Sequence, residues 1–258
     1  MNVKAKKHLG QHFLTDENIA KKIVEGLDFQ PYQYVLEVGP GTGVLTKYLL
    51  EKPTETYVAE IDTESIEYLK LHYQKLENKH FTGDFLKINL SDVFSGEVAV
   101  IGNFPYNISS QILFKIIENY QQIPEMVGMF QKEVAERTAA VPRTKDYGIL
   151  SVLVQAYYDV KYLFTVHENV FNPPPKVKSG VIKLTRNRKE GLEGNEILFK
   201  QIVKTGFGQR RKKLSNALKS LDIPEVLKSH AFMDKRAEEL SVEDFINFTK
   251  EWKAAKMG

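Results

Sequence analysis

The sequence contains no cysteine, which excludes disulfide bonds and cysteine-ligated metal sites. It has no apolar run near the ~20 residues of a membrane span, and no apolar segment follows the basic start of the chain, as a signal peptide would require. The six histidines show no metal-ligand spacing, and no Walker loop or Gly-x-Ser-x-Gly elbow appears. We therefore expect a cytoplasmic protein that binds neither metal nor membrane.

Charge of one sign is missing from one long stretch. The net charge of the 258 residues is only +3, so nucleic-acid binding must be argued from where the basic residues lie. From Ile197 to Leu221 there is no acidic residue, while the same stretch holds Lys200, Lys204, Arg210, Arg211, Lys212, Lys213 and Lys219. This pattern predicts phosphate contact, with a merely solvated face as the alternative.

Strand-like and helix-like segments alternate through the first two thirds of the chain. Such alternation predicts an α/β fold with a mostly parallel sheet and helices on both faces, which binds ligands beyond the carboxyl ends of its strands. The expected strands are 34–38, 56–61, 97–101, 126–131, 152–158 and 181–185, and the expected helices are 45–51, 63–76 and 109–120.

The pattern changes after Thr185. A polar segment with two glycines, residues 186–195, is typical of a linker, and the apolar spacing beyond it is helical. Ser241 and Asp244 form a predicted capping box before a helix over 245–252. We expect two domains, a catalytic domain over 1–188 and a small all-helical domain over 189–258, which carries the basic stretch and binds RNA.

A glycine-rich segment, Glu37–Gly43, follows the first expected strand. Gly39 and Gly41 allow the backbone to turn tightly and to approach a ligand closely. The spacing is G-x-G-x-G, and Val44 occupies the third glycine position of the dinucleotide fingerprint, which argues against NAD.

Two acidic residues follow the next expected strands. Glu60 is placed to accept both hydroxyl protons of an adenosine ribose, and Asp84 to accept from the adenine amino group. Each could instead be an ordinary surface or turn acid. Together with the glycine loop they predict binding of S-adenosylmethionine.

Residues 103–107 read Asn-Phe-Pro-Tyr-Asn. The residue before a proline avoids helical geometry, which favours an open backbone whose carbonyls lie outside a helix ladder. Asn103 offers a side-chain carbonyl, and Tyr106 offers a face on which a base can stack. The unit suits the amino group of adenine or cytosine, although a turn between strand and helix is the plainer interpretation.

These residues resemble the KsgA (RsmA) family of small-subunit rRNA adenine dimethyltransferases and, more distantly, the Erm large-subunit enzymes. The resemblance covers nearly the whole chain and implies a Rossmann-like S-adenosylmethionine-dependent methyltransferase. Its motifs are Leu9–Leu14, Glu37–Thr46, Ala59–Asp62, Gly83-Asp84, Asn103–Ser109, Gln131–Val134, Phe171–Val177 and Gln209–Lys212.

The resemblance also implies roles for particular residues. His12 and Leu14 should close over the methionine end of the cofactor, and Phe171 should stack on the target adenine opposite Tyr106. The amino protons of that adenine should bind Asn103 and the Pro105 carbonyl. The implied cofactor contacts are His12, Leu14, Gly39, Gly41, Glu60, Asp84 and Asn103, and the RNA contacts are Lys176, Arg210, Arg211, Lys212 and Lys213.

The expected reaction is dimethylation of two adjacent adenosines near the 3' end of 16S rRNA, within the small subunit or its precursor, by a monomer. Three prolines before Lys176 and the Gln-Arg-Arg-Lys run favour this over an Erm-type 23S rRNA enzyme. The sequence also leaves open a non-catalytic assembly factor and a DNA adenine methyltransferase. Phe104 replaces the leucine that is most common there, and we expect altered packing without a change of reaction.

Overall fold

The computed structural model describes residues 3–257 and divides into two compact units. One unit ends at Glu136 and resumes over Asp159–Arg186, and the other comprises Arg137–Tyr158 and the residues from Asn187 onward. The sequence placed a single boundary between 188 and 189, so the structure differs by assigning 137–158 to the second unit. Residues 1, 2 and 258 of the expected domains lie outside the described residues.

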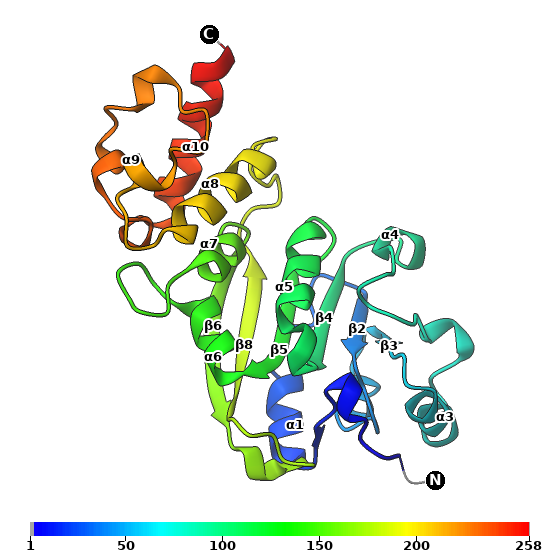
Figure 1. The fold of residues 1–258 in the computed structure, drawn as a ribbon. Coiled ribbons are helices and arrows are strands. Elements are labelled where there is room, and N and C mark those ends of the chain that lie inside the picture. Colours follow the sequence, from blue (N-terminus) through cyan, green and yellow to red (C-terminus); the bar gives the residue numbers. More distant parts are fainter. Residues whose placement is uncertain (1–2, 258) are drawn as a thin grey trace. The chain divides into compact units, whose positions relative to one another are not determined.

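A six-stranded sheet forms the centre of the first unit, in the order β3-β2-β4-β5-β8-β6 (Figure 1). The pairs β2–β3, β2–β4 and β4–β5 are parallel, and β8 runs antiparallel to β5, which confirms the predicted mostly parallel sheet. The strands are β2 (Tyr34–Val38), β3 (Glu55–Ala59), β4 (Val98–Asn103), β5 (Glu125–Gln131), β6 (Tyr158–Val166) and β8 (Ser179–Arg186).

Helices cover both faces of this sheet. Alternate strand residues such as Val35 and Val127 pack with Ile23 of α1 in one buried cluster, while Figure 1 shows α5 on the opposite side of the sheet from α1. The helices that begin in this unit are α1 (Glu17–Val24), α2 (Thr46–Leu49), α3 (Thr63–His72), α4 (Leu90–Val93), α5 (Ser109–Glu118) and α6 (Lys132–Ala139).

The strand order creates a crevice at the carboxyl ends of β2 and β4. The chain leaves β2 first toward β3 and later returns to β4 on the other side, so the connections diverge between these two strands. Gly39 follows β2 with a φ of +69°, and Asn103 ends β4. A Cβ built on Gly39 would lie 3.8 Å from Pro105 Cδ and 3.9 Å from the Asn103 carbonyl oxygen. The glycine loop and the Asn-Phe-Pro-Tyr segment are therefore neighbours.

A separate two-stranded sheet joins the beginning of the chain to a later segment. The strand β1 (Phe13–Leu14) pairs antiparallel with β7 (Phe171–Asn172), and Leu14 is the partner of Phe171. His12 Nδ1 also lies 2.8 Å from the Pro173 carbonyl oxygen, to which it can donate. The N-terminal segment is thereby held in a defined position.

The second unit is helical, as the sequence predicted. Its larger helices are α7 (Ile149–Gln155), α8 (Glu196–Gly208), α9 (Leu214–Ala217) and α10 (Val242–Met257). The rings of Phe207 and Phe245 join α8 to α10, with centroids 5.9 Å apart. The capping box is confirmed, because the Asp244 amide donates to Ser241 Oγ at 3.1 Å and the Ser241 amide donates to the Asp244 carboxylate at 2.9 Å.

The expected strand over 152–158 is wrong, because most of this run belongs to helix α7. Ser151, Val152, Leu153 and Val154 are all buried, and a helix buried on every side lacks the periodicity that separates it from a strand. The Ser151 hydroxyl accepts from the Gly148 amide at 3.0 Å at the start of the helix. The tertiary surroundings, rather than the apolar pattern, decide this element.

Short 3-10 helices complete the described chain, in which no helix is long and apolar enough to cross a membrane. They are η1 (Lys7–Leu9), η2 (Asn78–His80), η3 (Tyr106–Ile108), η4 (Glu168–Val170), η5 (Glu225–Leu227), η6 (Ala231–Asp234) and η7 (Ala237–Glu239).

Candidate active site

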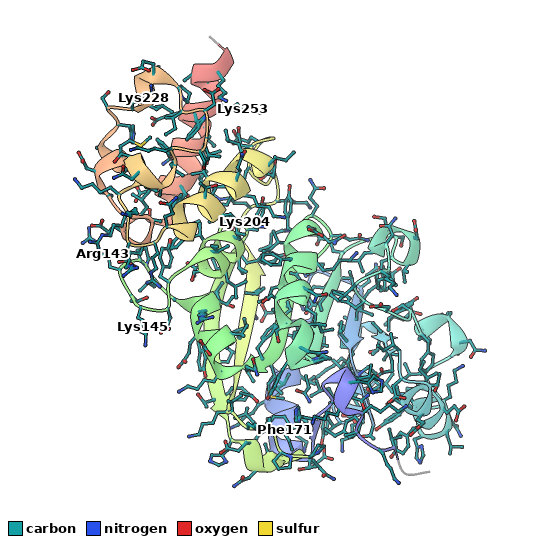
Figure 2. The ribbon with its side chains drawn as sticks, viewed as in Figure 1. Arg143, Lys145, Phe171, Lys204, Lys228 and Lys253 are labelled. Carbon is teal, nitrogen blue, oxygen red and sulfur yellow. The ribbon has the colours of Figure 1, made fainter. Side chains whose placement is uncertain are left out.

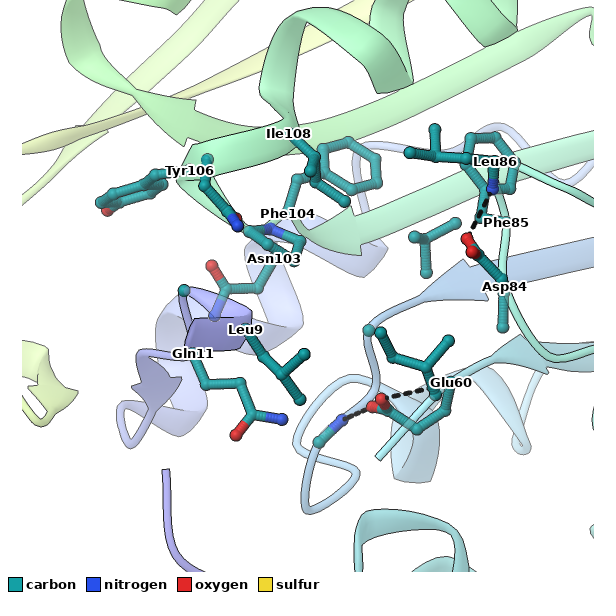
Figure 3. Close-up of a pocket in the computed structure, with 18 of the residues that line it drawn as sticks. Leu9, Gln11, Glu60, Asp84, Phe85, Leu86, Asn103, Phe104, Tyr106 and Ile108 are labelled. Carbon is teal, nitrogen blue, oxygen red and sulfur yellow. Dashed lines mark hydrogen bonds between the residues drawn. The ribbon is translucent and has the colours of Figure 1, made fainter. Parts of the chain in front are cut away.

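A cavity of about 140 Å³ opens at the carboxyl edge of the sheet in the first unit (Figure 3). The N-terminal segment, the glycine loop, the ends of β3 and β4 and the loop after Gly83 form its walls. The predicted site residues that line it are His12, Gly39, Gly41, Glu60, Asp84, Asn103, Pro105 and Tyr106. Leu14 and Phe171 are not among the residues that line this cavity.

Glu60 is held at the end of β3 by backbone amides. One carboxylate oxygen accepts from the amides of Ile61 at 2.8 Å and Asp62 at 2.9 Å, and the other accepts from Gly41 at 3.3 Å. Burial raises the pKa of Glu60, and these three hydrogen bonds oppose the rise. A carboxylate has about four acceptor positions, so this group retains capacity for a ligand hydroxyl.

Asp84 is half-buried in the loop after Gly83, where its Oδ1 accepts from the Leu86 amide at 3.0 Å. Its other oxygen lies 3.4 Å from Lys87 Nζ, an exposed group. The expected strand before Asp84 is reduced to a single bridge between Phe81 and Val58. That bridge brings Asp84 beside the carboxyl end of β3 and its neighbour β2.

Asn103 is oriented by the N-terminal segment. Its side-chain nitrogen donates to the His12 carbonyl oxygen at 2.8 Å, so the amide oxygen points the other way. Among residues 3–257 no group donates to that oxygen, and Figure 3 shows it directed toward the side where Tyr106 lies. The structure therefore leaves a fixed, unoccupied acceptor at the wall of the cavity.

Pro105 and Tyr106 come two and three residues after Asn103. The sequence led us to expect a free Pro105 carbonyl. Instead, this carbonyl accepts long hydrogen bonds from the Ile108 amide at 3.3 Å and from the Ser109 hydroxyl at 3.4 Å. The Tyr106 hydroxyl bonds Ser179 Oγ at 2.5 Å, which fixes the ring beside the cavity. Burial raises the pKa of Tyr106, and the bond to Ser179 opposes the rise.

Phe171 lies away from this cavity, in the apolar core. Its side chain is 4% exposed and packs in the same buried cluster as Leu14 and Ile23, and Figure 2 shows it at the end of the sheet beside α1. Stacking on a base would require the segment around Phe171 to move. Leu14 borders a smaller cavity of about 20 Å³, which Gly39 and Asn103 also line.

Phe104 is accommodated by glycines, which explains how an aromatic ring fits at this position. A Cβ built on Gly128 would lie 2.0 Å from Phe104 Cε2, and one on Gly102 would lie 2.8 Å from Cε1. The ring also packs against Phe130 with centroids 4.9 Å apart. Any larger residue at 128 would displace this ring.

Glu37 is a site residue that the sequence analysis did not single out. It is fully buried in β2 and borders the smaller cavity, where the Thr46 hydroxyl donates to it at 2.5 Å. Burial raises the pKa of Glu37 to about 8, with Thr46 opposing and Glu60 adding to the rise. The sequence signal that could have identified Glu37 is a carboxylate within an otherwise apolar strand.

The sequence analysis also did not identify Asp62 as a residue that shapes the site. This buried carboxylate caps α3 by accepting from the Glu64 amide at 3.1 Å, and it binds Gln11 at 3.0 Å and Lys6. Burial alone would raise the pKa of Asp62, but the bonds from Lys6, Gln11 and Glu64 outweigh it and lower the pKa. Asp62 thus anchors the segment that forms one cavity wall.

The predicted RNA contacts fall in both units. Lys176 is exposed in the first unit, while Arg211 and Lys212 are exposed in the second and have no side-chain partner among the described residues. Lys213 forms an exposed ion pair with Asp234 at 3.0 Å. Arg210 is bound to protein groups rather than free for RNA, so for this residue the sequence-based role conflicts with the observed contacts.

The fold matches that of solved methyltransferases. A solved dimethyladenosine transferase from Plasmodium falciparum has a TM-score of 0.82 and 26% identity, with 95% of this chain and 98% of that chain covered. A solved 23S rRNA methyltransferase, ErmE, has a TM-score of 0.68 and 25% identity, covering 93% of this chain and 99% of that one. The chain has the Rossmann-like methyltransferase fold.

The sequence comparisons define the family. The model for "Ribosomal RNA adenine dimethylase" matches residues 2–254, and the chain belongs to that family. A protein of Flavobacterium johnsoniae, named ribosomal RNA small subunit methyltransferase A, is 59% identical over 98% of this chain and 97% of its own length. The protein of the same name from Cytophaga hutchinsonii is 57% identical over 96% of each chain.

Proposed function

We propose that this enzyme transfers methyl groups from S-adenosylmethionine to the amino groups of two adjacent adenosines near the 3' end of 16S rRNA. The product is dimethyladenosine in the small ribosomal subunit or its precursor, in the cytoplasm, with a role in subunit biogenesis. One observation carries the chemistry: Asn103 is held by the His12 carbonyl so that its own oxygen remains a free acceptor at the cavity. The names of the relatives support the substrate.

The cavity residues fit the proposed cofactor. Glu60 retains acceptor capacity for ribose hydroxyls, and Asp84 Oδ2 faces only an exposed lysine, so it can accept from an adenine amino group. Gly39 has no side chain, so a ligand can approach its backbone beside Asn103. S-adenosylmethionine, when bound, supplies a methyl group that its sulfonium already activates.

The chain's own task is to prepare the acceptor nitrogen. The lone pair of an adenine amino group is delocalised into the ring, so the nitrogen is a poor nucleophile. Hydrogen bonds from its protons to Asn103 Oδ1 and to the Pro105 carbonyl favour a pyramidal nitrogen. The Ser109 hydroxyl can release the Pro105 carbonyl, because it also lies 3.1 Å from the Tyr106 carbonyl oxygen, to which it can donate instead. These bonds strengthen as positive charge develops on the nitrogen, so they stabilise the transition state more than the ground state.

The target base must leave its stack to reach this cavity. Tyr106, fixed by Ser179, provides one stacking face, and an aromatic stack contributes on the order of 1–3 kcal/mol. Phe171 can provide a second face only after leaving the core cluster, so closure of a base sandwich would be coupled to movement of β7. No strong base is required, because the proton can pass to water after transfer.

The test uses the whole protein with isotopically labelled cofactor and three separate substrates: unmethylated small subunits, large subunits and duplex DNA. We expect label only in small subunits, with nuclease mapping giving dimethyladenosine at two adjacent positions near the 3' end of the rRNA. Label in large subunits would instead support an Erm-type enzyme, and label in DNA would support a DNA adenine methyltransferase. Binding to small subunits without any transfer would identify a non-catalytic assembly factor.

A further inference from the structure

Three polar residues meet where neighbouring strands of the first unit reach the carboxyl edge of the sheet. Asn103 ends β4, Gln131 ends β5 and Ser179 begins β8, and β5 lies between the other two strands. Because β8 runs antiparallel to β5, its first residue lies at the carboxyl end of β5, where Ser179 is the direct partner of Gln131. The sequence analysis gave Gln131 only as the first residue of a family motif and assigned it no role.

The side chains of these three residues lie on the same face of the sheet. Successive side chains of a strand alternate between the two faces, so residues two positions apart share a face. The residues two positions before Asn103, two before Gln131 and two after Ser179 all pack in the buried cluster that includes α1; they are Ile101, Met129 and Val181. The polar residues therefore form a row on the face that α1 covers.

The Tyr106 ring crosses this row. Tyr106 follows β4 closely in the chain, yet its hydroxyl bonds Ser179 Oγ on β8 at 2.5 Å. Since β5 lies between these strands, the ring passes over the end of β5, where Gln131 stands. Directly opposite residues of an antiparallel pair have Cβ atoms about 4.5–5.5 Å apart. The Gln131 side chain therefore begins next to the serine that holds the stacking ring.

Gln131 differs from its neighbours in the row because its hydrogen-bonding groups are unused. Its half-buried side chain has no hydrogen-bond partner among residues 3–257, whereas Asn103 and Ser179 are both engaged. It lines neither of the two cavities that Asn103 borders. A carboxamide carries two N–H donors and one acceptor oxygen. This position suits contact with a base stacked on Tyr106 better than contact with the cofactor.

The proposed reaction decides which atoms of the base such a donor can meet. Asn103 and the Pro105 carbonyl take up both amino protons of the adenine. The nearest remaining polar atoms are the ring nitrogens N1 and N7, on either side of the amino group, and both are hydrogen-bond acceptors. Guanine carries a proton on N1 and an oxygen in place of the amino group, so it would leave polar groups of this site unpaired, which is costly.

We propose that Gln131 is a specificity-determining residue whose side-chain amide donates a hydrogen bond to a ring nitrogen of the flipped target adenine, N1 or N7. The proposal rests on the proposed function. Stacking on Tyr106 leaves a base free to rotate in its own plane, and a hydrogen bond beside the amino group removes that freedom. Asn103 and Gln131, on adjacent strands, then fix two neighbouring positions of the base and align the amino nitrogen for transfer.

The experiment measures single-turnover methyl transfer by the whole protein to reconstituted small subunits. Both target positions carry adenosine, 1-deazaadenosine or 7-deazaadenosine, and each deaza base replaces one ring nitrogen by C–H while keeping the amino group. Any change in the reactivity of that amino group affects every variant equally, so it cancels when variants are compared on the same base. The test variants are Gln131→Ala and Gln131→Glu, and the second keeps the shape of glutamine but cannot donate when ionised.

The matched control is Gln33→Ala. Gln33 is exposed directly before β2, at the opposite edge of the same sheet, and has no side-chain hydrogen bond among the described residues. The melting temperature of each variant verifies folding. Affinity for S-adenosylhomocysteine, measured by titration without RNA, reports on the cofactor site alone.

We expect both Gln131 variants to transfer methyl groups to adenosine about tenfold more slowly than the unaltered enzyme, as loss of one hydrogen bond does. On one of the two deaza bases, the unaltered enzyme and Gln131→Ala should react at nearly the same rate, because the bond is already absent. Affinity for S-adenosylhomocysteine should not change, and Gln33→Ala should match the unaltered enzyme throughout.

The same rate ratio between the unaltered enzyme and Gln131→Ala on all three bases would overturn the proposal, and so would full activity of Gln131→Glu. A parallel loss of affinity for S-adenosylhomocysteine would assign Gln131 to the cofactor site and also overturn it. Transfer by the unaltered enzyme to unmodified small subunits is scored first. Its absence would refute the proposed function together with this role, whereas transfer with equal rate ratios would refute the role of Gln131 alone.

Discussion

The cofactor cavity and the basic region differ in how closely sequence motifs correspond to the observed contacts. In the cavity, Gly39, Glu60 and Asn103 stand at strand ends and meet as their motifs predict. In the basic region, neighbouring cations have different environments, because Arg210 is bound within the protein while Arg211 is exposed and unpaired among the described residues. The comparison teaches that a motif at a strand end predicts where its residues lie in the fold. A run of basic residues does not predict which of its side chains are free and which are bound within the protein.

The physical reason lies in the backbone. The hydrogen-bond ladder of a parallel sheet brings successive carboxyl ends to one edge, so residues just after the strands must share that edge. Long basic side chains instead reach any acceptor nearby, and their partners depend on loops elsewhere in the chain. Substitutions in the cavity and in the basic region test each side of this contrast.

The largest expected effect is at Asn103. Asn103→Ala removes the free acceptor and should reduce the rate of methyl transfer by about 10²–10³-fold, as loss of a transition-state hydrogen bond does. Single-turnover transfer to small subunits measures it, with cofactor affinity followed in parallel. Affinity should fall too, although less, because Asn103 also holds the His12 segment of the cavity wall.

The matched control is Asn18→Ala, which changes the same residue type in the same unit. Asn18 is exposed in α1, lines neither of the two cavities and has no side-chain hydrogen bond among the described residues, so its replacement should leave the chemical step intact. Full turnover by Asn103→Ala, or equal losses of turnover in the two variants, would contradict the assignment of Asn103 as the acceptor.

Glu37 offers a second test of the cavity. Its pKa is raised from 4.5 to about 8 by burial, so folding favours the protonated form and stability should fall as pH rises from about 4.5 to about 8. Glu37→Gln should remove this fall, which we expect to be on the order of a few kcal/mol. Denaturant unfolding at a series of pH values measures it.

Glu51→Gln serves as the comparison for that series, because Glu51 is an exposed glutamate of the same unit. It should leave the pH dependence of the unmodified protein unchanged. If Glu37→Gln shows the same slope as the unmodified protein over this pH range, Glu37 is ionised in the folded state and the inferred effect of burial is wrong.

A smaller effect is expected in the basic region. Arg210→Ala should destabilise the second unit by only about 1 kcal/mol, because the side chain is 38% exposed and solvent screens its ion pair. Hydrogen exchange of the Arg143 amide should increase, because the loop over residues 143–147 loses the hydrogen bonds that Arg210 donates to the carbonyls of Thr144 and Lys145. Lys213→Ala removes only an exposed pair and should be near neutral. Unchanged exchange in Arg210→Ala would mean that the loop is fixed by other contacts.

Much of the fold was predictable from local pattern. The glycine loop after β2 and the position of Asn103 follow from the alternation of strands and helices, and the Ser241–Asp244 capping box follows from residue spacing alone. The strand expected over 152–158 failed because a short buried apolar run carries no periodicity. Burial of that run depends on neighbours that are distant in sequence.

What the sequence by itself determined is therefore the class of fold, the cavity at the strand ends and the residues that follow those strands. Only the tertiary structure decided that Asp62 anchors the N-terminal segment, that Phe171 packs in the core, and that Arg210 holds the loop bearing Arg143. Each of these depends on a hydrogen bond or an apolar contact between residues far apart in the chain. Local propensity does not predict such contacts, because their free energy arises only when the folded chain brings the partners together.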